Sequence, residues 1–139
     1  MALALVLLTL AALPQSASSP PPAPTAGAET PEPAVVNAAR QWLALLDQGR
    51  WDDSYQATRA SFRTLNTAQV WAAASDRVRA PLGAMISRTF VSQENLPAPP
   101  YGYEVVKFRT RFADEADAIE TVTLDREGSD WRVVGVYVG

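Results

Sequence analysis

A chain of 139 residues with 47% apolar and 19% charged residues is long enough for one globular domain with a core, and too short for two. It contains no cysteine and no histidine, which excludes disulfides, thiol catalysis and a lipid on an N-terminal cysteine, and removes the usual parts of a zinc site or a Ser-His-Asp triad. The net charge of −3 and the absence of a basic block argue against nucleic-acid binding. We therefore expect no nucleic-acid partner, no metal and no cofactor.

The N-terminus begins with the uncharged apolar run MALALVLLTLAAL, which is shorter than the roughly 20 residues of a membrane-spanning helix. We interpret residues 1–18 as a signal peptide cleaved after Ser18, because small residues stand where a signal peptidase inspects the chain. No Lys or Arg precedes the run, so either the true start lies upstream or the signal is weak. The alternative is a buried helix of the mature fold. The signal interpretation predicts a periplasmic or secreted protein with no membrane span after cleavage.

Two further segments follow from composition. Residues 19–33 are rich in Pro and poor in large apolar side chains, which predicts a disordered linker. Residues 34–139 then form a single predicted α+β domain.

The first helix of this domain is expected to start at Thr30, where a capping hydroxyl is followed by Pro31 and Glu32, and to stop at Gly49. Its apolar residues repeat at spacings of four, three and four, as one buried helix face requires. That face comprises Val35, Ala39, Trp42 and Leu46.

Two more helices are expected before the sheet. The second begins near Trp51 and continues to Leu65, and its expected buried face comprises Trp51, Tyr55, Thr58, Phe62 and Leu65. A third begins at Asn66, which forms a capping-box pattern with Gln69, and ends before Pro81. Its inward residues are expected to be Val70, Trp71, Ala74 and Val78.

From Gly83 onward the apolar residues repeat with a period of two, which indicates strands over 84–93, 103–112, 118–126 and 131–138. The predicted fold is therefore α+β, with three N-terminal helices packed on a curved antiparallel β-meander of about four strands.

Strand register can be inferred because a slip of one residue would turn every side chain to the wrong face. If ADEAD is the first turn, Phe108 faces Val122 and Val106 faces Leu124. A two-residue Gly-Ser turn in the next hairpin sets Leu124 against Val133. Both hairpins then share one apolar inner face.

Several motifs, in this order, resemble the bacterial family called domain of unknown function 4019: WLALLDQGRWDDSY, the RAPLG corner followed by SR, TRF, ETVTL and WRVVGVY. The resemblance spans about Val35 to the end and implies a small exported domain without an assigned activity. The order of helices then meander is similar to the nuclear-transport-factor-2-like (cystatin-like) fold. That similarity implies a pocket between sheet and helices, which some relatives use for catalysis and many for binding.

The stretch RVRAPLGAMISR contains the first site candidates. It can be a plain helix stop, with Arg77 and Arg79 at the negative end of the helix dipole and Pro81 and Gly83 as breakers. Alternatively Arg79, Arg88 or both hold a carboxylate or phosphate at the mouth of the pocket. Arg88 shares a strand side with apolar residues, so it needs an acidic partner if that side is buried.

A cavity enzyme of this fold would need a carboxylate or tyrosine in the pocket, and the candidates are Tyr55, Glu120 and Tyr137. Both tyrosines can equally be core residues with the hydroxyl at an edge. Glu120 is expected on the inner face, either at a pocket rim or in an ion pair with Arg88 or Arg111. No motif assigns a catalytic residue.

The outer face of the last two strands is expected to carry a semi-apolar patch that includes Thr121, Thr123, Val134 and Val136. Such a patch is a candidate homodimer face, or it is covered by the linker or a loop. Our leading hypothesis is non-catalytic binding of a small-molecule ligand or an envelope protein in the bacterial cell envelope. The alternatives are a cavity enzyme of isomerase or hydrolase type and a dimeric interaction or structural module.

Overall fold

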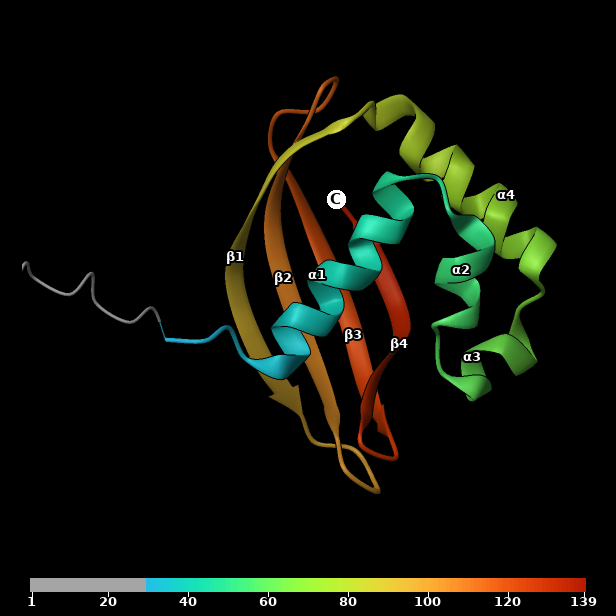
Figure 1. Ribbon diagram of the computed structural model, residues 1–139, viewed down its shortest axis with the longest axis vertical. Coiled ribbons are helices and arrows are strands. Elements are labelled where there is room, and N and C mark those ends of the chain that lie inside the picture. The colour runs from blue at the N-terminus through green and yellow to red at the C-terminus, as the bar shows by residue number, and fades with distance from the viewer. Residues whose placement is uncertain (1–29) are drawn as a thin grey trace, which may run out of the picture. The chain divides into compact units, whose positions relative to one another are not determined.

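The computed structural model describes residues 30–139, and residues 31–139 form one α+β unit (Figure 1). The predicted signal peptide and most of the predicted linker lie outside the described residues. The elements in chain order are α1 (Ala34–Asp47), α2 (Trp51–Gln56), α3 (Ala60–Leu65), α4 (Ala68–Arg79), the 3₁₀ turn η1 (Ala80–Leu82), β1 (Met85–Leu96), β2 (Tyr103–Phe112), β3 (Ala118–Glu127) and β4 (Asp130–Val138). The predicted fold class is confirmed, with four α-helices before the sheet instead of three.

Helix α1 lies across one face of the sheet (Figure 1) and buries the predicted stripe together with two further residues, Val36 and Leu43. Its start differs from the prediction. The N-cap is Pro33, whose carbonyl accepts a hydrogen bond from the Asn37 N–H at 3.0 Å, and no side chain caps the helix. Gly49 follows the helix with a φ of 68°, as the predicted stop requires.

The predicted second helix is divided into α2 and α3. At the break, Thr58 forms an isolated parallel bridge with Val133, and the Arg59 N–H donates to the Val133 carbonyl at 2.8 Å. The Arg59 side chain also pairs with the buried Asp125 of β3. These long-range bonds to the sheet replace the bonds that would have continued the helix. The predicted burial of Leu65 is wrong, since this residue is 84% exposed.

Helix α4 is capped one residue later than predicted, because the Thr67 hydroxyl accepts the Val70 N–H at 3.2 Å. Its inward face is also rotated. Val70, Ala74 and Val78 are exposed, and the buried residues of the helix are Ser75 and Arg79. The spacing of apolar residues did not predict this face, because its two buried residues are polar.

The four strands form an antiparallel meander in the order β1-β2-β3-β4, as predicted. The register between β2 and β3 differs by two residues from the prediction, since Val106 faces Val122 and Phe108 faces Glu120. The reason is an asymmetric loop in which the Phe112 N–H donates to the Glu115 carbonyl at 2.7 Å. A shift of two residues keeps every side chain on its face, so the inner face is the predicted one.

The predicted pairing of Leu124 with Val133 is confirmed. Immediately beyond it the ladder shifts, and Thr123 of the outer face pairs with Gly135. One extra residue in β4 therefore forms a bulge, and a glycine at such a point is common.

Beyond the bulge, the side chains of β4 point to the opposite side of the sheet from the one predicted. Val136 pairs with the buried Val122 and packs against the core, whereas Tyr137 pairs with Thr121 and is 69% exposed. The predicted inward position of Tyr137 and outward position of Val136 are both wrong. The predicted dimer face thus retains Thr121, Thr123 and Val134, which are half-buried, and lacks Val136. Dimerisation through this face stays a prediction.

Candidate functional site

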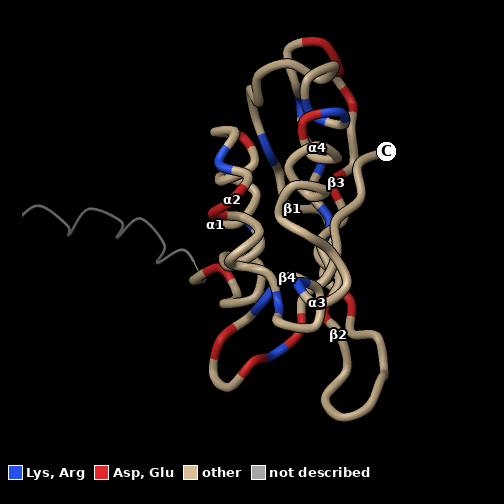
Figure 2. Tube along the Cα trace, turned by 90° about the vertical axis from the view of Figure 1, so that its right-hand side faces the viewer, with Lys and Arg blue, Asp and Glu red and all other residues tan. Residues whose placement is uncertain are grey.

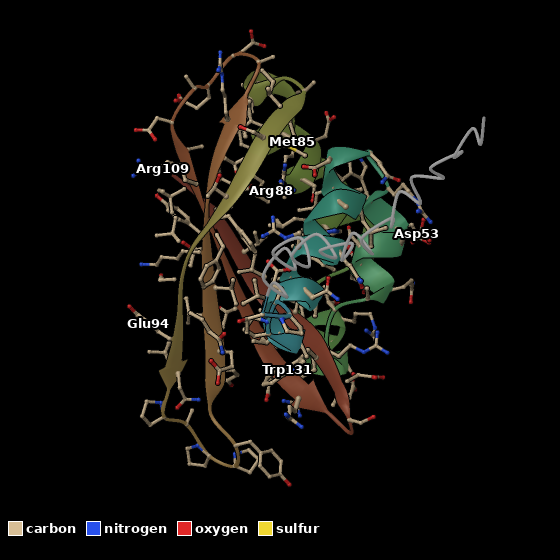
Figure 3. All side chains as sticks on the ribbon, turned by 60° about the vertical axis from the view of Figure 1, so that its left-hand side comes forward. Asp53, Met85, Arg88, Glu94, Arg109 and Trp131 are labelled. Atoms are coloured by element: carbon tan, nitrogen blue, oxygen red, sulfur yellow. The ribbon has the colours of Figure 1, made fainter. Side chains whose placement is uncertain are left out.

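Four charged side chains meet where the helices end against the sheet. Asp47 is the last residue of α1, Arg79 is the last of α4, Arg88 lies on β1 and Glu120 lies on β3. We call these four residues the ion-pair cluster. Figure 3 shows Arg88 on the helix-facing side of β1, while Arg109 of β2 points to the opposite side.

Each arginine of the ion-pair cluster binds both acids. Arg79 donates through Nη1 to Asp47 Oδ1 at 3.0 Å and through Nη2 to Glu120 Oε2 at 2.7 Å. Arg88 donates through Nη1 and Nη2 to Asp47 Oδ2 and Oδ1 at 2.7 and 2.9 Å, and through Nε to Glu120 Oε1 at 2.7 Å. Thr110, which faces Arg88 across the β1–β2 ladder, also donates to Glu120 Oε1. Each of the four carboxylate oxygens therefore accepts at least one hydrogen bond.

The ion-pair cluster is almost closed to solvent, and the Glu120 side chain is 0% exposed. Burial by itself lowers the pKa of Arg88, but the hydrogen bonds and negative charges of Asp47 and Glu120 outweigh it and raise the pKa above its usual value. Two guanidinium groups face two carboxylates, so the cluster is electrically neutral. These ion pairs act as a structural clamp that joins α1 and α4 to the sheet.

The sequence candidates are distributed over three places. Arg79, Arg88 and Glu120 meet in the ion-pair cluster, and the predicted pairing of Arg88 with an acid is confirmed. Tyr55 lies elsewhere, and its hydroxyl donates to the Asn66 carbonyl at 2.7 Å. Tyr137 is on the outer face of β4 and largely exposed, and it lines the rim of a pocket between α4 and β4.

Sequence reasoning missed Asp47 as a member of the site. A signal for it was present, because an acid in the last turn of a helix lies at the negative end of the helix dipole and is unfavourable without a cationic partner. Asp47 ends α1 in that unfavourable position, and both clustered arginines supply the partner.

A separate pocket of about 270 Å³ lies between α4 and β4. Its lining includes Leu46, Trp71, Ala74, Ser75, Val136 and Val138. We call it the α4–β4 pocket. It exists because the bulge turns Val136 and Val138 toward the helices. Most of its lining is apolar, and Arg79 lines it as well, so it borders the ion-pair cluster.

A larger hollow of about 640 Å³ lies near the β1–β2 loop and the β3–β4 turn. Two of the charged side chains in its lining are already engaged. Glu104 accepts hydrogen bonds from Gln93 and Asn95, and the Arg126 guanidinium lies 4.6 Å from the centre of the Trp131 ring. We therefore regard the α4–β4 pocket as the better candidate for a ligand.

Between residues 30 and 139 no group of three or more acidic side chains could hold a metal ion, and no helix is long and apolar enough to cross a membrane. Basic and acidic positions are distributed over several parts of the described trace (Figure 2). The model of the family described as "Protein of unknown function (DUF4019)" matches residues 38–136. No curated protein matches the chain.

Proposed function

The chain belongs to the DUF4019 family, whose description assigns no activity, and we propose that its domain binds small, largely apolar molecules in the α4–β4 pocket without chemical conversion. The observation that carries this proposal is the pocket itself, with apolar walls from α4 and β4. Removing apolar ligand surface from water contributes roughly 25 cal/mol per Å², so such walls favour an apolar occupant.

The enzyme alternative has less support. Glu120 is the carboxylate that sequence reasoning considered for catalysis, but it is fully buried and bound by Arg79, Arg88 and Thr110. A general base must reach the proton that it abstracts, directly or through one water. The arrangement of Glu120 favours a structural role for it.

The interaction-module alternative also has less support. It was based on an outer patch that included Val136, and this residue packs against the core. An inward Val136 helps to build the α4–β4 pocket instead. The observed position of Val136 therefore supports the binding of a small molecule better than it supports an interaction surface.

We expect toluene to bind in the α4–β4 pocket, and Ala74→Phe to weaken its binding about tenfold or more. Ala74 is exposed on α4 and lines the pocket, so the added ring fills the ligand space without disturbing the core. The measurement is a two-dimensional NMR titration of the full-length protein, with the amide signals of Ser75 and Val136 followed as toluene is added.

Ala73→Phe is the matched control, because Ala73 is the exposed neighbour on the same helix. It adds the same ring outside the pocket and should leave the toluene affinity unchanged. Equal weakening by both variants, or no toluene-dependent shift in the unmodified protein, would contradict the proposed function.

We also propose that the domain is exported through a cleaved signal peptide. The support is the apolar run over residues 1–13 and the small residues that end at Ser18. In a Gram-negative expression host, the periplasmic fraction should contain a protein whose measured intact mass is that of residues 19–139. An uncleaved protein confined to the cytoplasm would count against export.

A further inference from the structure

Ser75 is an unusual residue of the α4–β4 pocket. It is 7% exposed, it lies on the inward face of α4, and its hydroxyl has no hydrogen-bond partner within residues 30–139. Buried hydroxyl groups are almost always hydrogen-bonded, since an unmade bond is unfavourable. Alanine would suit the same helical position better. The hydroxyl is therefore unexplained by the folded chain alone.

The charge around the pocket restricts what can pair with Ser75. Arg79 lines the pocket, but its guanidinium already binds Asp47 and Glu120. A ligand carboxylate would bring a third buried acid to two arginines and leave one negative charge unbalanced. Burial of an unbalanced charge is costly. The pocket consequently favours an uncharged ligand.

The size of the pocket suits a small molecule. Its volume of about 270 Å³ is close to the lower end of the range of ligand pockets, which begins at about 300 Å³. Probes of the size of a benzene ring with a short substituent are therefore appropriate.

We propose that the α4–β4 pocket selects small uncharged molecules that carry one hydroxyl or carbonyl oxygen, and that this oxygen pairs with the Ser75 hydroxyl. The inference rests on the proposed function and adds the chemical class of the ligand. Ser75 Oγ is placed by a single rotatable bond, so the ligand can draw it toward the pocket by a change of rotamer. The apolar residues Leu46, Trp71 and Val136 line the space for the remainder of the molecule.

Three probes of similar size test this selection: toluene, benzyl alcohol and benzoate. Their dissociation constants are measured by NMR titration of the full-length protein and of Ser75→Ala. We expect the unmodified protein to bind benzyl alcohol about 2- to 10-fold more tightly than toluene, as one hydrogen bond provides. Benzoate should bind more weakly than benzyl alcohol. In Ser75→Ala the preference for the alcohol should disappear while toluene binds as before.

The thermal melting of Ser75→Ala separates this role from a structural one. Loss of an unpartnered hydroxyl should leave the melting temperature unchanged or raise it. The control is Ser61→Ala at an exposed serine of α3, which should likewise not lower the melting temperature. A lowered melting temperature would show that the hydroxyl supports the fold, and would overturn the inference.

Two binding results would also overturn the inference. If toluene binds and Ala74→Phe blocks it, but the alcohol preference is absent or survives in Ser75→Ala, the ligand class is wrong and the proposed function stands. If none of the three probes shifts the Ser75 and Val136 signals, the pocket itself is wrong and both proposals fail.

Discussion

Replacement of Glu120 by glutamine is expected to lower the free energy of unfolding by about 3–5 kcal/mol. The carboxylate is 0% exposed and receives hydrogen bonds from Arg79, Arg88 and Thr110. The substitution keeps the size of the side chain but leaves two buried guanidinium groups with Asp47 as their single acid. The amide also presents N–H donors where the arginines need acceptors. Urea unfolding followed by tryptophan fluorescence measures the change.

The control for this prediction is Glu94→Gln on β1. Glu94 is exposed, and Figure 3 shows it on the sheet at a distance from the helices. Its replacement should change stability by no more than about 0.5 kcal/mol. If Glu120→Gln were as mild as its control, the ion-pair cluster would not be the clamp between helices and sheet that we describe. An unchanged urea dependence in both variants would confirm that the same surface is exposed on unfolding.

Gly83→Ala is expected to lower the free energy of unfolding by about 1–3 kcal/mol. Gly83 has φ 75° and ψ −168°, a backbone conformation that is essentially restricted to glycine. An added Cβ would also lie 2.6 Å from Asp114 Oδ2 and 3.1 Å from Ala113 Cβ. The exposed Asp114 carboxylate can rotate away, so the backbone conformation accounts for most of the loss. Thermal and urea unfolding both measure it.

Gly135→Ala is the control for Gly83→Ala. An added Cβ at Gly135 meets nothing within 4 Å, and this glycine has no positive φ. We expect a change within about 0.5 kcal/mol. Equal losses at the two glycines would mean that the corner after α4 does not depend on the conformation of Gly83, contrary to our description of it.

The RAPLG corner shows how a sequence motif can combine two roles. Arg79 ends α4 and Gly83 turns the chain into β1, as the helix-stop interpretation predicts. The same Arg79 is a member of the ion-pair cluster. The predicted alternative was that Arg79, Arg88 or both hold an anion at the mouth of the pocket. Both arginines do bind carboxylates, but these belong to Asp47 and Glu120 of the same chain.

Local patterns in the sequence determined the order of helices and strands and the buried faces of several of them. The spacing of apolar residues predicted the face of α1, and alternation predicted the inner face of β2 and β3. The need of a buried Arg88 for an acidic partner was also readable, as was the pairing of Leu124 with Val133. Each of these depends on residues close in sequence or on a short turn, so the periodicity of one segment contains the information.

Tertiary contacts decided the features that form the candidate sites. A hydrogen bond from the Arg59 N–H to the Val133 carbonyl divides the second helix, and the bulge before Gly135 turns Val136 inward. Asp47 joins the ion-pair cluster because α1 ends beside α4 and β1. None of these has a local signature strong enough to fix it, since each is set by bonds between segments far apart in the chain. The sequence by itself therefore determined the α+β architecture, while long-range hydrogen bonding and strand register decided where its pocket and its charge cluster lie.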